Sequence, residues 1–150
     1  MNRSRSCQTL WATVALALAA SAASAAETRQ WLDWQPLLPL PDPIGVAGPF
    51  VGSHQGGLIV AGGANFAPAE AADLWEVPKQ FHQAAFVLAP AAGEAGGFAW
   101  RTGFALERPL AYGACASTPA GIVCAGGDDG SAVSAEAFLL TWDPERGGLK

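Results

Sequence analysis

The side chains best suited to anion binding and proton transfer lie in the second half of this 150-residue chain. Arg108 carries a planar guanidinium, which can bind a carboxylate through two parallel hydrogen bonds. Asp128 and Asp129 follow a Gly-Gly pair and carry carboxylates, which act as acids or bases when their pKa values suit the working pH. Two roles are open for each. Arg108 either contacts a ligand or bridges structural units, and the Asp pair either faces a pocket or hydrogen-bonds its own turn.

Four further residues are candidates for substrate binding. Asn65 follows an earlier Gly-Gly pair, in a place that corresponds to the Asp pair. Lys79 and Trp75 lie in a long loop, where they either cover a ligand or remain a solvated or capping part of the surface. Tyr112 is the only tyrosine and lies in an apolar stretch, where packing of its ring competes with a role in binding.

No metal site is predicted. The chain has two histidines, His54 and His82, and neither lies at metal-ligand spacing from a cysteine or a carboxylate. His54 is expected at the surface, and His82 shares the long loop with Lys79.

The N-terminus has the pattern of an export signal. Arg3 and Arg5 precede an apolar run, Leu10 to Ala20, which is too short to span a bilayer and is followed by small residues. We therefore expect residues 1–26 to be a signal peptide cleaved near Ala25 or Ala26, and the remainder to be periplasmic or secreted.

The remainder of the chain, residues 27–150, is acidic. Without Arg3 and Arg5, six Lys and Arg residues stand against thirteen Asp and Glu residues, a formal charge of −7. No basic stripe is present, so nucleic acid is excluded as the expected partner. No later segment has the uninterrupted apolar length of a membrane helix.

The organisation of this part is set by an internal repeat. A stretch from Trp34 to Gly62-Gly63 has the same order of parts as a stretch from Trp100 to Gly126-Gly127, and one repeat is the interval from Gly62 to Gly126. Each has a Trp, a proline-marked turn, an apolar strand, a small-residue turn, four apolar residues and Gly-Gly. Such a period marks an architecture of stacked repeats. We expect Trp34, Trp100 and Trp142 in the cores of these units.

Each repeat is predicted to contain antiparallel strands. In the first they are expected at about 46–52, 58–61, 84–88 and 98–102, and in the second at about 111–117, 122–125 and 137–142, without a fourth. Four-stranded antiparallel units that repeat are typical of β-propeller blades. A β-sandwich is the alternative, and the repeat favours the propeller.

The turn at Thr118 to Gly121 determines how Cys115 and Cys124 are placed. A two-residue turn puts them directly opposite each other, but Pro119 cannot supply the positive φ of a type I′ turn. A type I turn with a bulge at Gly121 therefore fits better and turns the two cysteines to opposite faces. We expect both to be free and buried.

Four segments carry a resemblance to a known family. They are LPDPIGVAGPF (40–50), GGANF (62–66), ERPLAYGAC (107–115) and AGGDDG (125–130). They resemble the kelch-repeat sialic acid (N-acetylneuraminate) mutarotase or epimerase family, in particular its cyclically permuted branch, which also occurs fused to sodium/solute symporters. The resemblance runs from about Trp34 to Trp142.

The resemblance implies an all-β, six-bladed kelch propeller, of which this chain holds about two blades. We expect a closing strand at 30–36, a first blade at 44–102 and an incomplete second blade at 108–150. A fragment of this kind leaves blade faces uncovered, which promotes assembly or aggregation.

The implied activity is that of an exported isomerase, which anomerises sialic acid or a related sugar acid by acid–base catalysis without a cofactor. Arg108, Asp128 and Asp129 take the catalytic positions, and Asn65, Trp75, Lys79 and Tyr112 the substrate-binding ones. The fragment alone is expected to be inactive. The alternative is a non-catalytic extracytoplasmic kelch domain that binds sugar or protein. One form of this alternative is the N-terminal part of a sodium/solute symporter fusion.

Overall fold

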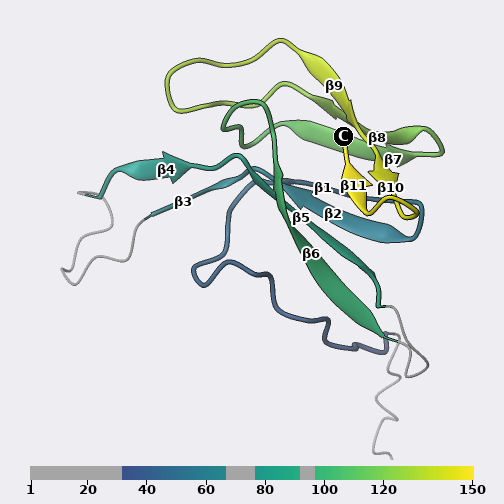
Figure 1. Cartoon of the computed structure of the whole chain (residues 1–150). Coiled ribbons are helices and arrows are strands. Elements are labelled where there is room, and N and C mark those ends of the chain that lie inside the picture. The colour runs from purple at the N-terminus through teal and green to yellow at the C-terminus, as the bar shows by residue number, and fades with distance from the viewer. Residues whose placement is uncertain (1–31, 67–76, 92–96) are drawn as a thin grey trace, which may run out of the picture. The chain divides into compact units, whose positions relative to one another are not determined.

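The computed structural model describes residues 32–66, 77–91 and 97–150. The chain divides into two units, Met1–Pro36 and Leu37–Lys150, and every strand lies in the second (Figure 1). The described residues form strands and turns without a helix. Among them, no helix therefore has the length and apolar character needed to cross a membrane. The signal peptide predicted at 1–26 lies outside the described residues.

The first repeat forms a four-stranded antiparallel sheet, which we call the first blade. Its strand order is β1 (Phe50–His54), β2 (Gly57–Ala61), β5 (Ala84–Pro90) and β6 (Phe98–Ala105). Gln55 and Gly56 connect β1 to β2 with φ values of 48° and 74°. Two successive positive φ values are the mark of a type I′ turn, whose twist suits a tight hairpin.

The second repeat forms the second blade, a three-stranded sheet of β7 (Ala114–Thr118), β8 (Gly121–Ala125) and β9 (Ala137–Leu140). Beyond β9, β10 (Trp142–Asp143) pairs with β11 (Gly148–Leu149). Thr141 and Lys150 exchange two backbone hydrogen bonds of 2.7 and 3.0 Å. The hairpin therefore starts a fourth strand beside the continuation of β9, and the other strands lie close to their predicted positions.

A short hairpin of β3 (Ala64–Phe66) and β4 (Lys79–Phe81) projects from the first blade between β2 and β5 (Figure 1). Isolated bridges join Ala47 to Ala64 and Ala111 to Asp128. The second bridge is the first one shifted by one repeat. The predicted strands at 46–52 and 111–117 are thus interrupted, because each chain segment makes one bridge before its regular ladder begins.

The two blades pack face to face around one core. Phe50 and Ile59 of the first blade and Ile122 and Cys124 of the second are all fully buried in this cluster. A Cβ added at Gly52 would lie 2.8 Å from Ile122 Cδ1, so the absence of a side chain allows close approach of the sheets.

One expectation about the tryptophans is confirmed, one is met in part and one is wrong. Trp142 is 4% exposed and Trp100 is half-buried. Trp34 is 80% exposed, and residues 32–36 form no strand. Residues 30 and 31 lie outside the described part.

The expected register of the cysteines is also wrong. Thr118 pairs with Gly121 and no bulge follows, so Cys115 lies directly opposite Cys124. Thr118 Oγ1 donates a hydrogen bond to Gly121 O at 2.7 Å and accepts one from Ala120 N at 3.3 Å, so the Thr118 side chain closes the turn without a bulge. Both thiols are free as expected, but Cys124 alone is buried and Cys115 is exposed at the surface.

Candidate functional site

The candidate residues gather at one end of the two blades. The loops that follow β2 and β8 leave the sheets at this end, the left of Figure 1, and the segment that leads into β7 crosses between them. Gly62 and Gly63 open the first loop, and Gly126 and Gly127 open the second, all four with positive φ. The repeat therefore places Asn65 and the Asp pair on equivalent loops.

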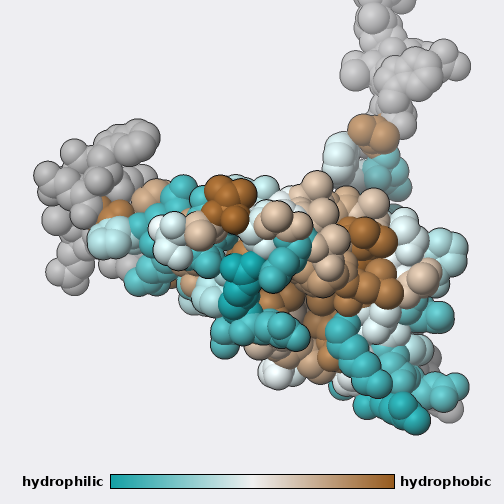
Figure 2. All heavy atoms as spheres, turned by 90° about the horizontal axis from the view of Figure 1, so that it is seen from above, coloured by the Kyte–Doolittle hydropathy of each residue, from teal (hydrophilic) through white to brown (hydrophobic). Residues whose placement is uncertain are grey.

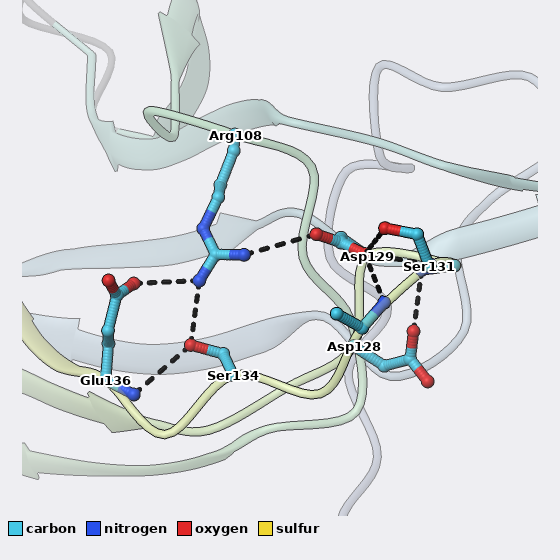
Figure 3. Close-up of polar contacts among 8 residues, drawn as sticks. Arg108, Asp128, Asp129, Ser131, Ser134 and Glu136 are labelled. Carbon is cyan, nitrogen blue, oxygen red and sulfur yellow. Dashed lines mark hydrogen bonds and ion pairs between the residues drawn. The ribbon is translucent and has the colours of Figure 1, made fainter.

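Arg108 holds the loop after β8 (Figure 3). Its Nη1 lies 3.2 Å from Asp129 Oδ2, and its Nη2 lies 2.8 Å from both Ser134 Oγ and Glu136 Oε2. The hydrogen bond to Glu136 is the main cause of a pKa above the ordinary value for arginine. The side chains that Arg108 contacts thus all belong to one loop. The alternative role considered from the sequence was a bridge between structural units, and these contacts do not form one.

Asp129 is fixed by its own turn as well as by Arg108. Its Oδ1 accepts hydrogen bonds from Ser131 Oγ at 2.6 Å and from the backbone N–H groups of Ser131 and Ala132 at 2.8 Å each. These bonds, the Ser131 hydroxyl first, hold the pKa of the Asp129 carboxyl far below its usual range, and the charge of Arg108 lowers it further. Asp129 therefore stays ionised at neutral pH and serves as an acceptor.

Asp128 is held through both its backbone and its side chain. Its N–H and C=O pair with Ala111, and its Oδ1 accepts a hydrogen bond from Gly130 N at 2.6 Å. The Asp pair thus stabilises its own turn, the second of the two roles open from the sequence. The second carboxylate oxygen of Asp128 makes no protein hydrogen bond among the described residues.

An aromatic group surrounds Lys79 on the β3–β4 hairpin. Lys79 Nζ lies 5.0 Å from the centroid of the Tyr112 ring and 5.6 Å from that of Phe66, which is cation–π geometry. Tyr112 is 49% exposed and its φ is 63°, a left-handed conformation that costs free energy in a residue with a side chain. This ring therefore lies at the surface under the lysine, where it packs against Phe81 as well.

Asn65 and His82 form a hydrogen-bonded pair beside this group. Asn65 Nδ2 donates to Gly45 O at 2.9 Å, which orients the amide so that Oδ1 faces His82. The distance from Oδ1 to His82 Nε2 is 2.6 Å. Because Oδ1 can only accept, Nε2 of His82 donates this hydrogen bond, and Nδ1 makes no hydrogen bond to the other described residues.

Phe81 connects the two groups of polar residues. Its ring makes an edge-on contact with Tyr112 at 6.2 Å between centroids. A Cβ added at Gly130 would lie 2.9 Å from the same ring. The structure therefore unites Asn65, Lys79 and Tyr112 with the turn that carries Asp128 and Asp129. Trp75, the remaining candidate, lies outside the described residues.

Several residues of this site were not proposed from the sequence, among them Ser134, Glu136 and Phe81. The first two lie in a loop without periodicity, so only folding shows that they meet Arg108. A cavity of about 460 Å³ opens beside Arg108 and Glu136 and is lined mainly by apolar side chains, among them Leu110 and Phe138. Within the part of the chain that the structure describes, no three His, Cys, Asp or Glu residues cluster as a metal site would require.

The arrangement is suited to binding an acidic ligand. The Glu136 side chain that pairs with Arg108 is 73% exposed, and exposed ion pairs contribute little to stability. A ligand carboxylate can therefore replace Glu136 at the Arg108 fork, while Asp129 keeps the guanidinium oriented. Lys79, Tyr112 and the His82–Asn65 pair provide hydrogen-bonding groups on the neighbouring loop.

Curated proteins with similar sequences share one name. The chain is 36% identical to the N-acetylneuraminate epimerase of Vibrio cholerae serotype O1 over 124 aligned residues, a match covering 73% of this chain and 30% of that protein. The N-acetylneuraminate epimerases of Brucella suis and Brucella melitensis biotype 1 are each 35% identical over 107 residues, covering 66% of this chain and 26% of those proteins. The chain thus spans less than a third of the length of the curated relatives it matches. No protein-family model matches the chain.

A solved structure shows the same fold. The structure of YjhT superposes with a TM-score of 0.64 at 24% sequence identity, over 82% of this chain and 36% of that one. YjhT is a kelch β-propeller, so the two sheets described above are blades of such a propeller. The comparisons confirm both the kelch fold and the resemblance to N-acetylneuraminate epimerases that the GGANF and RPLAYG segments indicated.

Proposed function

We propose that this chain forms part of an exported sugar mutarotase that interconverts the anomers of N-acetylneuraminate or a related sugar acid. The observation that carries the proposal is the similarity to three proteins named N-acetylneuraminate epimerase, which extends over most of the chain. The predicted signal peptide supports export.

In this proposal Arg108 binds the sugar carboxylate in place of Glu136. The guanidinium is oriented beforehand by Asp129 and Ser134, at 3.2 and 2.8 Å, so little freedom is lost when the ligand arrives. Asp129 is a positioning residue, because its lowered pKa leaves it without a proton to donate near neutral pH.

Anomerisation requires one proton to reach the ring oxygen while another leaves the anomeric hydroxyl. The free Nδ1 of His82 and the second carboxylate oxygen of Asp128 are the acceptors that the described loops offer for the second step. The Lys79 ammonium and the Tyr112 hydroxyl are the donors beside them. The corresponding loops of further blades would complete the wall of the pocket in a protein of the relatives' length.

The test measures binding of N-acetylneuraminate to the purified chain by ligand-observed NMR. We expect binding that exceeds that of N-acetylmannosamine, which lacks the carboxylate. Arg108→Ala should weaken it by about tenfold or more, the effect of losing a charged hydrogen bond. Arg101→Ala, at an exposed arginine on β6, is the matched control and should leave affinity unchanged. Equal binding of both sugars, or equal effects of both variants, would contradict the proposal.

A second candidate is a non-catalytic domain that binds a sugar acid outside the cytoplasm, alone or ahead of a transporter. The ion pair of Arg108 and Asp129 favours this candidate. The guanidinium of Arg108 can bind an anion, and Asp129, which stays ionised at neutral pH, has no proton to donate. The rate of α-to-β exchange of N-acetylneuraminate separates the two. With this chain alone we expect the buffer rate for both candidates. With a chain extended to the relatives' length, acceleration supports the mutarotase, and binding without acceleration supports the second candidate.

A further inference from the structure

Cys115 and Cys124 lie directly opposite each other on β7 and β8. Directly opposite residues of an antiparallel ladder point to the same face of the sheet. For this pair it is the face that packs on the first blade, where Cys124 is fully buried and Cys115 Sγ lies against Val51 of β1. Both thiols therefore belong to a contact that the two blades of this chain make with each other, and it needs no further part of the protein.

The register also brings the two cysteines close together. Hydrogen-bonded and non-hydrogen-bonded pairs alternate along an antiparallel ladder, and the pair that flanks a two-residue turn is hydrogen-bonded. Thr118 and Gly121 flank the turn between β7 and β8, so Cys115 and Cys124, three pairs further along, form a non-hydrogen-bonded pair. The Cα atoms of such a pair are about 4.5 Å apart, at the short end of the range that disulfides span.

The first blade shows the same register one repeat earlier. Val51 and Val60 are the repeat equivalents of Cys115 and Cys124 and also lie directly opposite each other. Val51 N donates a hydrogen bond to Cys115 Sγ at 3.3 Å, and Val51 O accepts one from it at 3.2 Å. Both backbone groups of Val51 thus point away from β2, which is the orientation found in a non-hydrogen-bonded pair.

The two thiols differ in access to solvent. Cys115 is exposed, so an external reagent can reach its sulfur. Cys124 is fully buried, and burial raises the pKa of its thiol to about 11, so the exposed thiol is the one that reacts first. An accessible cysteine next to a second cysteine that can resolve its oxidised form is typical of redox-active pairs.

We propose that Cys115 and Cys124 form a reversible disulfide and that its formation releases β1 from β7. The oxidant is a small disulfide such as oxidised glutathione. The Cys115 thiolate attacks one sulfur of this oxidant, which forms a mixed disulfide and releases a first thiol. Cys124 then gives up its proton, its sulfur attacks Cys115 Sγ, and a second thiol leaves. Two electrons and two protons thus pass from the cysteine pair to the oxidant, which is reduced to two thiols.

Oxidation changes the contact between the blades because Cys115 Sγ has both of its hydrogen-bond partners on β1. A disulfide sulfur has no proton to donate to Val51 O, and its bond to Cys124 draws it away from Val51 N. Ser53 N keeps its hydrogen bond to Ser117 Oγ at 2.8 Å, since neither serine takes part in the exchange. The redox state of the surroundings is thereby coupled to one hydrogen-bonded link between β1 and β7. The predicted signal peptide would deliver the chain to a compartment in which such oxidants prevail.

The first test equilibrates the folded chain with mixtures of oxidised and reduced glutathione. Cys7→Ser, in the predicted signal peptide, leaves Cys115 and Cys124 as the only thiols. After quenching in acid and unfolding, N-ethylmaleimide labels the free thiols, and intact mass counts them. We expect an unlabelled monomer with oxidised glutathione alone and labelling of both thiols in an excess of reduced glutathione.

Three results of this experiment overturn the proposal. The first is a chain whose thiols are both labelled in every mixture. The second is a chain that ends with glutathione on Cys115 and a free thiol at Cys124, because the buried cysteine then fails to resolve the mixed disulfide. The third is a disulfide that excess reduced glutathione does not open, because the bond is then not reversible.

Hydrogen exchange of single amides, measured by NMR, tests the release of β1. The Val51 amide should exchange about fivefold faster in the oxidised chain than in the reduced chain, as expected for the loss of one hydrogen bond. The Ser53 amide, on the same edge of β1, is the matched control and should exchange at the same rate in both forms. Exchange at Val51 that does not depend on the redox state contradicts the proposal, as does equal acceleration of both amides.

Discussion

Ser53 and Ser117 occupy the same position in successive blades and are joined by a hydrogen bond. The backbone N–H of Ser53 donates to Ser117 Oγ at 2.8 Å. Two residues earlier, Cys115 Sγ lies 3.3 Å from Val51 N and 3.2 Å from Val51 O. Side chains of β7 thus satisfy backbone groups along the outer edge of β1, which an edge strand otherwise leaves to solvent.

Ser117→Ala should therefore destabilise the chain, while Ser53→Ala should not. The first change leaves Ser53 N without its acceptor, at a cost of about 1 kcal/mol in the free energy of unfolding. The hydroxyl of Ser53 makes no hydrogen bond among the described residues, so its loss removes nothing comparable. Urea unfolding of both variants under identical conditions measures the difference. Equal midpoints would show that the bond between the blades does not contribute.

Gly62 and Gly126 provide a second matched pair. Their φ values are 70° and 72°, but a Cβ at Gly62 would clash with the backbone oxygen of Leu110, whereas the nearest atom at Gly126 is Ser134 O at 3.7 Å. Gly126→Ala should cost only the strain of a positive φ, about 1–2 kcal/mol. Gly62→Ala adds a backbone clash and should cost clearly more, as measured by thermal unfolding. A larger loss of stability for Gly126→Ala than for Gly62→Ala would mean that the carbonyl of Leu110 moves away from the added Cβ at little cost in free energy.

The hydrogen bonds that the ionised Asp129 carboxylate accepts in its turn should persist at acidic pH. Because the folded-state pKa of Asp129 lies below its ordinary value of about 3.9, its contribution to stability is complete above that pH. The contribution is lost as the pH falls through the folded-state pKa. An NMR titration of the carboxyl carbon should give a midpoint well below 3.9. Ser131→Ala should move that midpoint upward, since the Ser131 hydroxyl is the largest cause of the shift, whereas Ser134→Ala, which removes a partner of Arg108, should change it less.

The two cysteines should differ in reactivity. Burial, and then the charge of Cys115, raise the pKa of the Cys124 thiol to about 11, so it remains protonated at pH 8. Thiolate is the reactive form, so iodoacetamide should modify Cys115 and spare Cys124 in the folded chain. Unfolding should expose both, and peptide mapping by mass spectrometry distinguishes them. If neither reacts after unfolding without reductant, the thiols are joined in a disulfide.

The raised pKa of Cys124 also predicts that the free energy of unfolding declines between about pH 8.5 and 11. In this range the thiol of Cys124 loses its proton in the unfolded chain but keeps it in the folded chain.

Most of the local structure follows from the sequence because its causes are local. The alternating and apolar runs bounded by glycines predict β2, β5 and β8 to within a few residues. The recurrence of the Trp to Gly-Gly pattern predicts that two units of the same kind follow each other. A repeat and its strand pattern are written in neighbouring residues, so they can be read without knowledge of distant contacts.

The tertiary structure decided what depends on contacts between distant segments. Ser134 and Glu136 meet Arg108 because two loops converge, and no spacing along the chain indicates this. The register of Cys115 depends on a bond made by the side chain of Thr118, which competes with the bulge that proline favours. The opposite burial of Ile59 and Val123 arises because packing covers one face of each blade, and residues with the same place in the repeat then differ in their neighbours. Sequence by itself determined the repeating unit, and only the stacking of one unit on the next determined which side chains are buried and which are exposed.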